Sequence, residues 1–239
     1  LSAITFLFLI LIPVLTMKTL AEERRQKTDQ MLFTSPVSVE NIVLGKYLAL
    51  VTVYMIPVFV ICFYPLIMSK YGTVSYAMAY TAILGFAFMG FAELSIGVFI
   101  SSLTENPVIA AVVGFLVLFV CFMSEGIGSL VAETSVTSLV IYMVMVAAAA
   151  YLIYYMIKNV LIPLIIGLAG EIVLVVLYIV DSTRFEGSFQ DFLTIFDITS
   201  HFDNFTNGIL DIQGLIYFLS IIVIFLFLTI QSIKKRRWS

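Results

Sequence analysis

Long runs of apolar residues, separated by short polar breaks, dominate this chain. Each run has about the 17 to 25 residues that an α-helix needs to cross the hydrocarbon core of a bilayer. The runs span 1–17, 43–67, 76–101, 107–124, 138–157, 159–180 and 214–233. Only helices and closed barrels satisfy their backbone polar groups in lipid. The pattern therefore predicts an all-α, polytopic transmembrane helix bundle with seven spans in one domain, 1–239.

The break between the fifth and sixth runs is the shortest. It consists of Lys158 and Asn159, and Pro163 follows in the first turn of the next helix, where proline is tolerated. The alternative is one bent helix over 138–180, which at 1.5 Å per residue would span about 64 Å, twice the thickness of the hydrocarbon core. We therefore expect two helices.

Composition supports a membrane protein and excludes a soluble domain. Hydrophobic residues make up 62% of the chain and charged residues 11%, whereas soluble domains carry about 25% charged residues. The mean hydropathy is +1.14. Both cysteines, Cys62 and Cys121, lie inside apolar runs, and we interpret them as packing residues.

The basic residues predict the orientation, because loops rich in Lys and Arg stay in the cytoplasm. Placing 18–42 inside leaves only Lys70 and Arg184 of the twelve basic residues outside. The other ten are Lys18, Arg24, Arg25, Lys27, Lys46, Lys158, Lys234, Lys235, Arg236 and Arg237. This assignment predicts a cytoplasmic C-terminus and an acidic extracytoplasmic loop, 181–213. It also puts the chain's start outside, which with the missing initial Met predicts one further helix upstream.

The loop between the first two runs predicts a cytoplasmic amphipathic helix over 18–34. Its apolar stripe contains Met17, Leu20, Ala21, Thr28, Met31 and Leu32, and its charges are Glu22, Glu23, Arg24, Arg25, Lys27 and Asp29. Nearly balanced charge fits a groove on a partner protein better than a lipid surface. An interfacial helix on the inner leaflet is the alternative.

Local signals mark several helix ends. Ser35-Pro36 stops the amphipathic helix, since a residue before proline avoids the α region. Ser38 is then placed to cap the next helix, and Asn106 with Pro107 to begin the one after the turn 101–106.

Two acidic residues, Glu93 and Glu171, lie inside apolar runs. A charge at that depth is costly unless it faces a cavity or a partner, so both are candidate functional residues. The alternative is a protonated glutamate that hydrogen-bonds within the bundle. Glu93 is expected to face the bundle or a dimer interface beside Ser95, Gly90 and Gly97. Its replacement by Gln should then preserve folding, and by Leu should harm assembly or activity.

Other chemistry is absent from the sequence. No G-x-x-x-x-G-K-[ST] motif occurs, so the chain has no ATP-binding loop of this kind, and we expect neither catalytic residues nor a metal site. The single histidine, His201, lies in the outer loop. That loop alternates acids with Phe189, Phe192, Phe196, Phe202 and Phe205, which predicts short interfacial helices. An outer gate or a docking surface for an accessory subunit is the alternative.

Three runs carry a resemblance to a known family. They are LTMKTLAEERRQKTDQMLFTSPVSVENIVLGKYLA (15–49), SSLTENPVIAA (101–111) and HFDNFTNGILD with IYFLSIIVIFLFLTIQSIKKRRW (201–211 and 216–238). They resemble ABC-2 type transporter permeases, also called type V exporters, and the last resembles the gliding-motility-type branch. The family's first helix is absent, as in an N-terminally truncated chain, and the pair 138–180 is an addition to its six-helix plan.

The resemblance implies a function. It implies an exporter permease in the bacterial cytoplasmic membrane, paired with a second permease copy or a related permease. A separate ABC ATPase subunit carrying ATP and Mg would dock on 18–34 as a coupling helix, and an accessory extracytoplasmic subunit is a further expected partner. No cofactor is expected in this chain, and neither composition nor resemblance suggests a nucleic-acid partner. The alternative is a membrane subunit that transmits ATPase-driven motion without transport.

Overall fold

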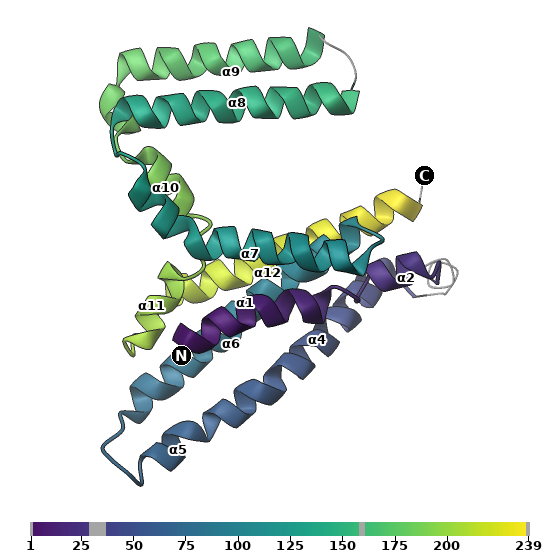
Figure 1. Ribbon diagram of the computed structural model, residues 1–239, viewed down its shortest axis with the longest axis vertical. Coiled ribbons are helices and arrows are strands. Elements are labelled where there is room, and N and C mark those ends of the chain that lie inside the picture. Colours follow the sequence, from purple (N-terminus) through teal and green to yellow (C-terminus); the bar gives the residue numbers. More distant parts are fainter. Residues whose placement is uncertain (1, 29–36, 158–160, 238–239) are drawn as a thin grey trace. The chain divides into compact units, whose positions relative to one another are not determined.

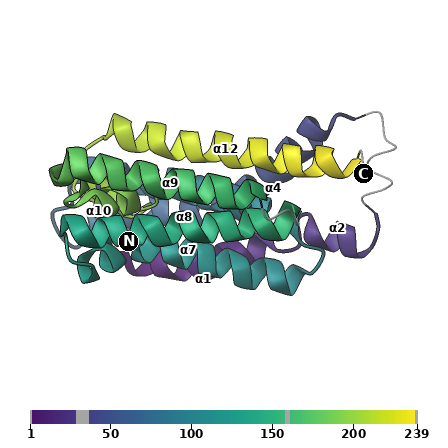
Figure 2. The ribbon, with the colours of Figure 1, turned by 90° about the horizontal axis from the view of Figure 1, so that it is seen from above.

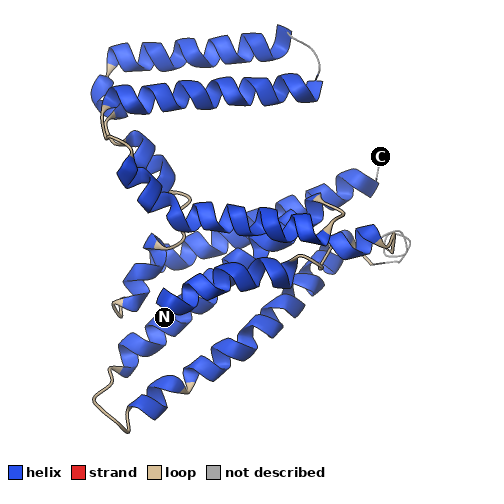
Figure 3. Cartoon of the chain, viewed as in Figure 1, coloured by secondary structure: helices blue, strands red, loops and turns tan. Residues whose placement is uncertain are grey.

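The computed structural model describes residues 2–28, 37–157 and 161–237. Every regular element within these ranges is helical, which confirms the all-α prediction (Figure 3). The first helices are α1 (Ser2–Thr16), α2 (Ala21–Arg25), α4 (Val39–Cys62), α5 (Tyr64–Met68), α6 (Tyr76–Leu103) and α7 (Pro107–Leu130). The others are α8 (Ser135–Ile157), α9 (Leu161–Val180), η1 (Ser182–Phe185), α10 (Ser188–Thr194), α11 (Ser200–Thr206) and α12 (Ile212–Arg237).

Six helices in the described ranges are long and apolar enough to cross a membrane. They are Ile4–Arg25, Val39–Met68, Tyr76–Leu103, Pro107–Leu130, Pro163–Val180 and Ile212–Lys235. In α8 the apolar stretch Ser135–Tyr151 is shorter than these. The predicted seventh span and the predicted upstream helix therefore remain predictions, whereas a multi-spanning helix bundle is consistent with the six spans.

The chain divides into two compact units, where the sequence predicted one domain. Unit 1 comprises Leu1–Phe122 and Ile198–Ser239, and unit 2 comprises Met123–Asp197. The predicted outer loop 181–213 is split between them. It contains η1 and α10 in unit 2 and α11 in unit 1, so short helices form there as expected.

Helix α6 is the centre of unit 1. It packs against α1, α4, α11 and α12 (Figure 1). Of the most apolar 18-residue stretch of α6, 72% is buried. Glycines allow this close packing, because a Cβ at Gly90 would overlap the ring of Tyr54 and one at Gly97 would overlap the side chain of Thr16. Two tyrosines of α4 also donate hydrogen bonds to α6, Tyr54 to the carbonyl of Phe86 (2.9 Å) and Tyr47 to that of Phe91 (3.1 Å).

Unit 2 is built on two helices that lie side by side, α8 and α9. Small residues on α9 permit the contact, since a Cβ at Gly167 would lie 3.0 Å from the Cβ of Ala150, and one at Gly170 would lie 2.9 Å from Val146. The prediction of two helices rather than one bent helix over 138–180 is confirmed.

The predicted helix starts are also confirmed. The hydroxyl of Ser38 accepts a hydrogen bond from the backbone N–H of Asn41 at the start of α4 (3.3 Å). Asn106 Oδ1 accepts from the N–H of Val108 (2.9 Å), and Pro107 is the first residue of α7. The stop signal at Ser35-Pro36 lies outside the described residues.

Candidate functional site at the α2 end of unit 1

The junction between α1 and α2 begins where α1 ends. The hydroxyl of Thr16 donates back to the carbonyl of Ile12 (3.0 Å), and the N–H of Met17 donates to the carbonyl of Pro13 (2.9 Å). Residues 17–20 then form a turn, and α2 runs for five residues from Ala21 to Arg25. Within the described part of the predicted 18–34 helix, only Ala21–Arg25 is helical. Residues 29–36, including Asp29, lie outside the described ranges.

A serine on α6 holds this junction. The hydroxyl of Ser101 accepts hydrogen bonds from the N–H groups of Leu20 and Ala21 (both 3.1 Å) and donates to the carbonyl of Met17 (3.1 Å). Ser101 is fully buried. Because the first N–H groups of a helix have no partner within it, Ser101 supplies α2 with an acceptor from another helix.

A lysine on α4 makes a second attachment. The ammonium of Lys46 donates to the carbonyl of Thr19 (2.8 Å) and forms an ion pair with the carboxylate of Glu23. Both side chains are mostly buried, at 20% and 30% exposure. Lys27 stands at the i,i+4 position from Glu23, where a helix favours an ion pair, but the ion pair of Glu23 in the structure is with Lys46, from another helix.

The end of α2 is exposed, while Glu22 and Arg24 are partly buried. Glu22 pairs with Arg25 (2.6 Å) and accepts a hydrogen bond from the amide of Gln26 (2.7 Å), as its i,i+4 spacing predicts. The side chain of Arg25 is 61% exposed, and Gln26 and Lys27 are exposed as well. Lys27 has a φ of 57°, a left-handed conformation typical of a residue just after a helix end.

Other predicted cytoplasmic residues lie near the same end of unit 1. Lys234, near the end of α12, forms an ion pair with Glu40 in the first turn of α4 (2.6 Å). Figures 1 and 2 both show α2 and the last turns of α12 at one end of the unit. The sequence assigned these segments to one side of the membrane, and the geometry is consistent with that assignment.

The intramembrane acid Glu93 lies in the buried middle of α6. Its side chain is 5% exposed, and Oε2 has no hydrogen-bond partner among the described residues. Gly90 and Gly97, on either side of it along the helix, are the positions where Tyr54 and Thr16 approach most closely. The expectation that Glu93 points away from lipid agrees with this burial, while its functional role stays a prediction.

The second acid, Glu171, lies on α9 in unit 2 and is partly buried. Glu93 belongs to unit 1, so the two acids lie in different compact units of the chain. A role for Glu171 also stays a prediction.

The other end of unit 1 is aromatic. Phe202 and Phe205 of α11 are buried, and the ring of Phe205 occupies the space beside Gly85 and Gly214. The ring of His201 stacks on that of Tyr217, with centroids 3.9 Å apart. His201 therefore packs against α12, and these phenylalanines stabilise the fold.

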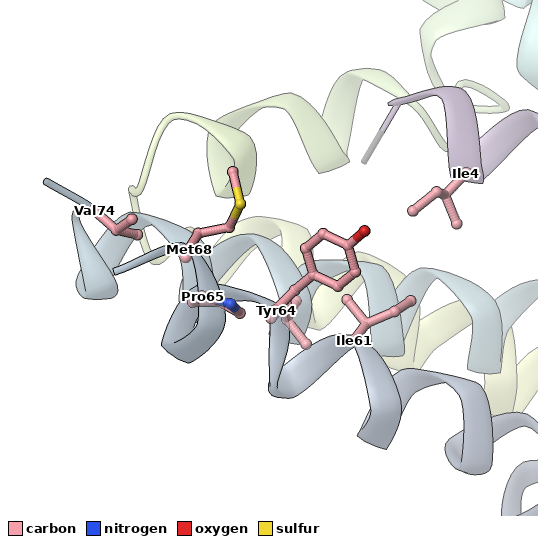
Figure 4. Close-up of a pocket in the computed structure, with 8 residues that line it drawn as sticks. Ile4, Ile61, Tyr64, Pro65, Met68 and Val74 are labelled. Atoms are coloured by element: carbon pink, nitrogen blue, oxygen red, sulfur yellow. The ribbon is translucent and has the colours of Figure 1, made fainter. Parts of the chain in front are cut away.

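An apolar pocket of about 480 Å³ lies between α1, the end of α4 with α5, and α6 (Figure 4). Its lining is Ile4, Ile61, Tyr64, Pro65, Met68, Val74, Ala79 and Ile83. This lining offers apolar contact and one phenol, that of Tyr64. Among the described residues no group of three His, Cys, Asp or Glu side chains is placed to hold a metal ion.

Sequence reasoning identified the charged segment but missed its attachments. The sequence places Ser101 only in a turn motif and Lys46 only among the cytoplasmic charges. The polar Ser101-Ser102 pair at the end of an apolar run was the available signal. The partner of Ser101, Ala21, lies 80 residues away along the chain. Local sequence patterns carry no information over that distance.

Comparison with known proteins identifies one family. A family model described as ABC-2 family transporter protein matches residues 1–230. No match was found among curated proteins or among solved structures.

Proposed function

The chain belongs to the ABC-2 family of transporter proteins, and from this premise we propose that it is the permease of an exporter driven through α2 by a separate ATPase. Membership makes it a multi-pass membrane protein and a permease subunit of an ABC transporter. Permeases of this family are not themselves ATPases. They generally work with an ABC ATPase subunit and dimerise.

One observation carries the proposal: α2 is attached to the bundle on one side and exposed on the other. Ser101 and Lys46 bind its buried side, while Arg25 and Lys27 are exposed. An element that receives force from a partner must combine a firm attachment with an accessible surface. The exposed cations favour a partner surface that carries carboxylates.

The cycle follows from this arrangement. ATP and Mg²⁺ bind to the partner ATPase, and the closing of two ATPase subunits moves the α2 segments of two permeases. Because the bundle is packed, it responds by switching between arrangements rather than by deforming continuously. The second permease is an identical copy or a relative, in the cytoplasmic membrane of a bacterium. An extracytoplasmic accessory subunit would meet the outer loop 181–213.

Charge reversal at Arg25 tests the docking. We expect Arg25→Glu to weaken association with the ATPase by about tenfold or more, because a like charge would then face the partner's carboxylates. The measurement is the amount of ATPase, identified by its ATP-binding motif, that copurifies with the full-length chain, together with the ATP hydrolysis of the complex. Undiminished association and hydrolysis would refute docking through this face.

Arg184→Glu is the matched control. Arg184 also pairs with an acid three residues earlier, Asp181 (2.8 Å), and is 84% exposed. Hydrogen bonds from Thr183 and Arg184 hold the pKa of Asp181 below its ordinary value, so this pair too is charged at neutral pH. The control lies in the predicted outer loop and should leave ATPase association unchanged.

Reconstitution tests the exporter activity. The purified complex in proteoliposomes should move candidate substrates across the bilayer only when ATP is present on the ATPase side. ATP hydrolysis that is coupled to conformational change, but moves no substrate across a broad panel, would instead favour a subunit that transmits motion.

A further inference from the structure

The hydroxyl of Ser101 uses its full hydrogen-bonding capacity at one point of the chain. A serine hydroxyl has one donor and two acceptor lone pairs. Here the donor binds the carbonyl of Met17, and the lone pairs accept from Leu20 and Ala21. Met17 and Leu20 belong to the turn between α1 and α2, and Ala21 is the first residue of α2. A single atom of α6 therefore holds both ends of this junction.

No local residue replaces this contact. Leu20, the residue that precedes α2, has no side chain able to cap the helix, and no side-chain cap is formed there. The N–H groups of Leu20 and Ala21 are buried with their residues. Without Ser101 they would be left without this acceptor in a buried setting, which is costly.

The neighbouring serine shows that this arrangement is specific. Ser102 is equally buried, yet its hydroxyl has no hydrogen-bond partner among the described residues. Two adjacent serines of the same helix turn are thus equally buried, and what Ser102 lacks is the attachment to the α1–α2 junction. This makes Ser102 a matched control for Ser101.

The attachment leads directly into the centre of unit 1. Ser101 lies in the last turn of α6, a continuous helix of 28 residues that packs on α1, α4, α11 and α12. The contact with Lys46 is made by a long side chain that keeps some solvent exposure. The Ser101 hydroxyl is fully buried, sits on a short side chain and contacts three backbone groups of the junction, so it follows movement of α2 more closely.

We propose that Ser101 is a positioning residue that fixes α2 on α6 and passes the displacement of α2 into the core of the permease. The inference rests on the proposed function, in which a partner ATPase moves α2. It adds the route by which that movement reaches the bundle: from the turn 17–21, through one hydroxyl, to the end of α6.

The test compares Ser101→Ala with Ser102→Ala in the full-length complex. Hydrogen exchange of the backbone amides in 18–25 reports the attachment without any need for nucleotide. A fluorophore at Tyr76→Cys, at the opposite end of α6, reports movement when Mg·ATP is added. The label requires Cys62→Ala and Cys121→Ala in every variant. The amount of bound ATPase is measured in parallel.

We expect Ser101→Ala to speed the exchange of Leu20 and Ala21 by about ten- to a hundredfold, since the buried N–H groups lose their acceptor. It should also reduce the nucleotide response at position 76 at least about fivefold while the ATPase stays bound. Ser102→Ala should match the wild type in all three measurements. Ser101→Cys keeps a weaker hydrogen-bonding atom, so its exchange should be intermediate. It is measured only in the unlabelled chain, because its thiol would compete for the fluorophore, and it maintains the exchange test where Ser101→Ala does not fold.

Two results would overturn the inference. The attachment would be refuted if Ser101→Ala and Ser101→Cys showed the same exchange as Ser102→Ala. The transmission would be refuted if the nucleotide response at position 76 were undiminished. A wild-type chain that binds no ATPase would refute the proposed function, and transmission with it. The exchange measurement would still decide whether Ser101 holds α2 on α6.

Discussion

Glu93 combines deep burial with an incomplete set of hydrogen bonds. Its Oε2 atom is buried and has no partner among the described residues, a situation that costs about 1–3 kcal/mol for a polar group. A residue kept only for stability would not need this carboxyl. The carboxyl of Glu93 therefore lowers the stability of the fold, and a contribution to activity can be measured separately from stability.

Substitutions at Glu93 test this separation. We expect Glu93→Gln to keep the fold and most of the activity, because the amide retains size and polarity. Glu93→Leu removes the unpartnered oxygen, so thermal stability should be equal or higher, while nucleotide-driven activity should fall because the carboxyl is lost. Thermal unfolding in detergent and ATP-driven transport are the two measurements. Full activity in both variants would make the acid incidental.

At the scale of elements, α2 is too short to be stable by itself. Five residues are well below the length at which an isolated helix persists in water, so the position of α2 depends on its attachments. The ion pair between Glu23 and Lys46 is one of them, and it joins α2 to α4.

Charge reversal tests that ion pair. Glu23→Lys should lower the unfolding temperature by about 2–4 °C, as expected for a loss of about 1 kcal/mol in a chain of this size. Adding Lys46→Glu should recover part of the loss, because the pair re-forms with reversed signs but the hydrogen bond from Lys46 to Thr19 is lost. Glu40→Lys, at the more exposed pair with Lys234, should have a smaller effect. No recovery in the double variant would mean that the pair is not stabilising.

At the scale of the whole molecule, the prediction concerns orientation in the membrane. A membrane-impermeant thiol reagent added to intact cells should label Arg184→Cys and should not label Lys27→Cys, in a chain carrying Cys62→Ala and Cys121→Ala. The reason is that basic segments remain cytoplasmic. A reporter fused after Ser239 should be active only in the cytoplasm. Labelling of Lys27→Cys in intact cells would refute the orientation.

The sequence by itself determined the class of the fold and several helix boundaries. Long apolar runs predict helices in a membrane because backbone groups have no other partner in lipid. Ser38 and the pair Asn106-Pro107 predicted helix starts, since capping depends on neighbours within a few residues. Composition and period alone also identified the charged segment 18–34, of which Ala21–Arg25 is helical in the described residues.

Only the tertiary structure decided how these elements attach to one another. It made α6 the central helix of unit 1, gave Glu23 its partner Lys46, and brought Ser101 to a turn 80 residues earlier. Contacts of this kind depend on which helix faces meet, and that choice follows from the fit of many side chains, such as Tyr54 at Gly90 and Thr16 at Gly97. Periodicity predicts that a helix forms, but steric fit between helices decides which residues of distant segments come into contact.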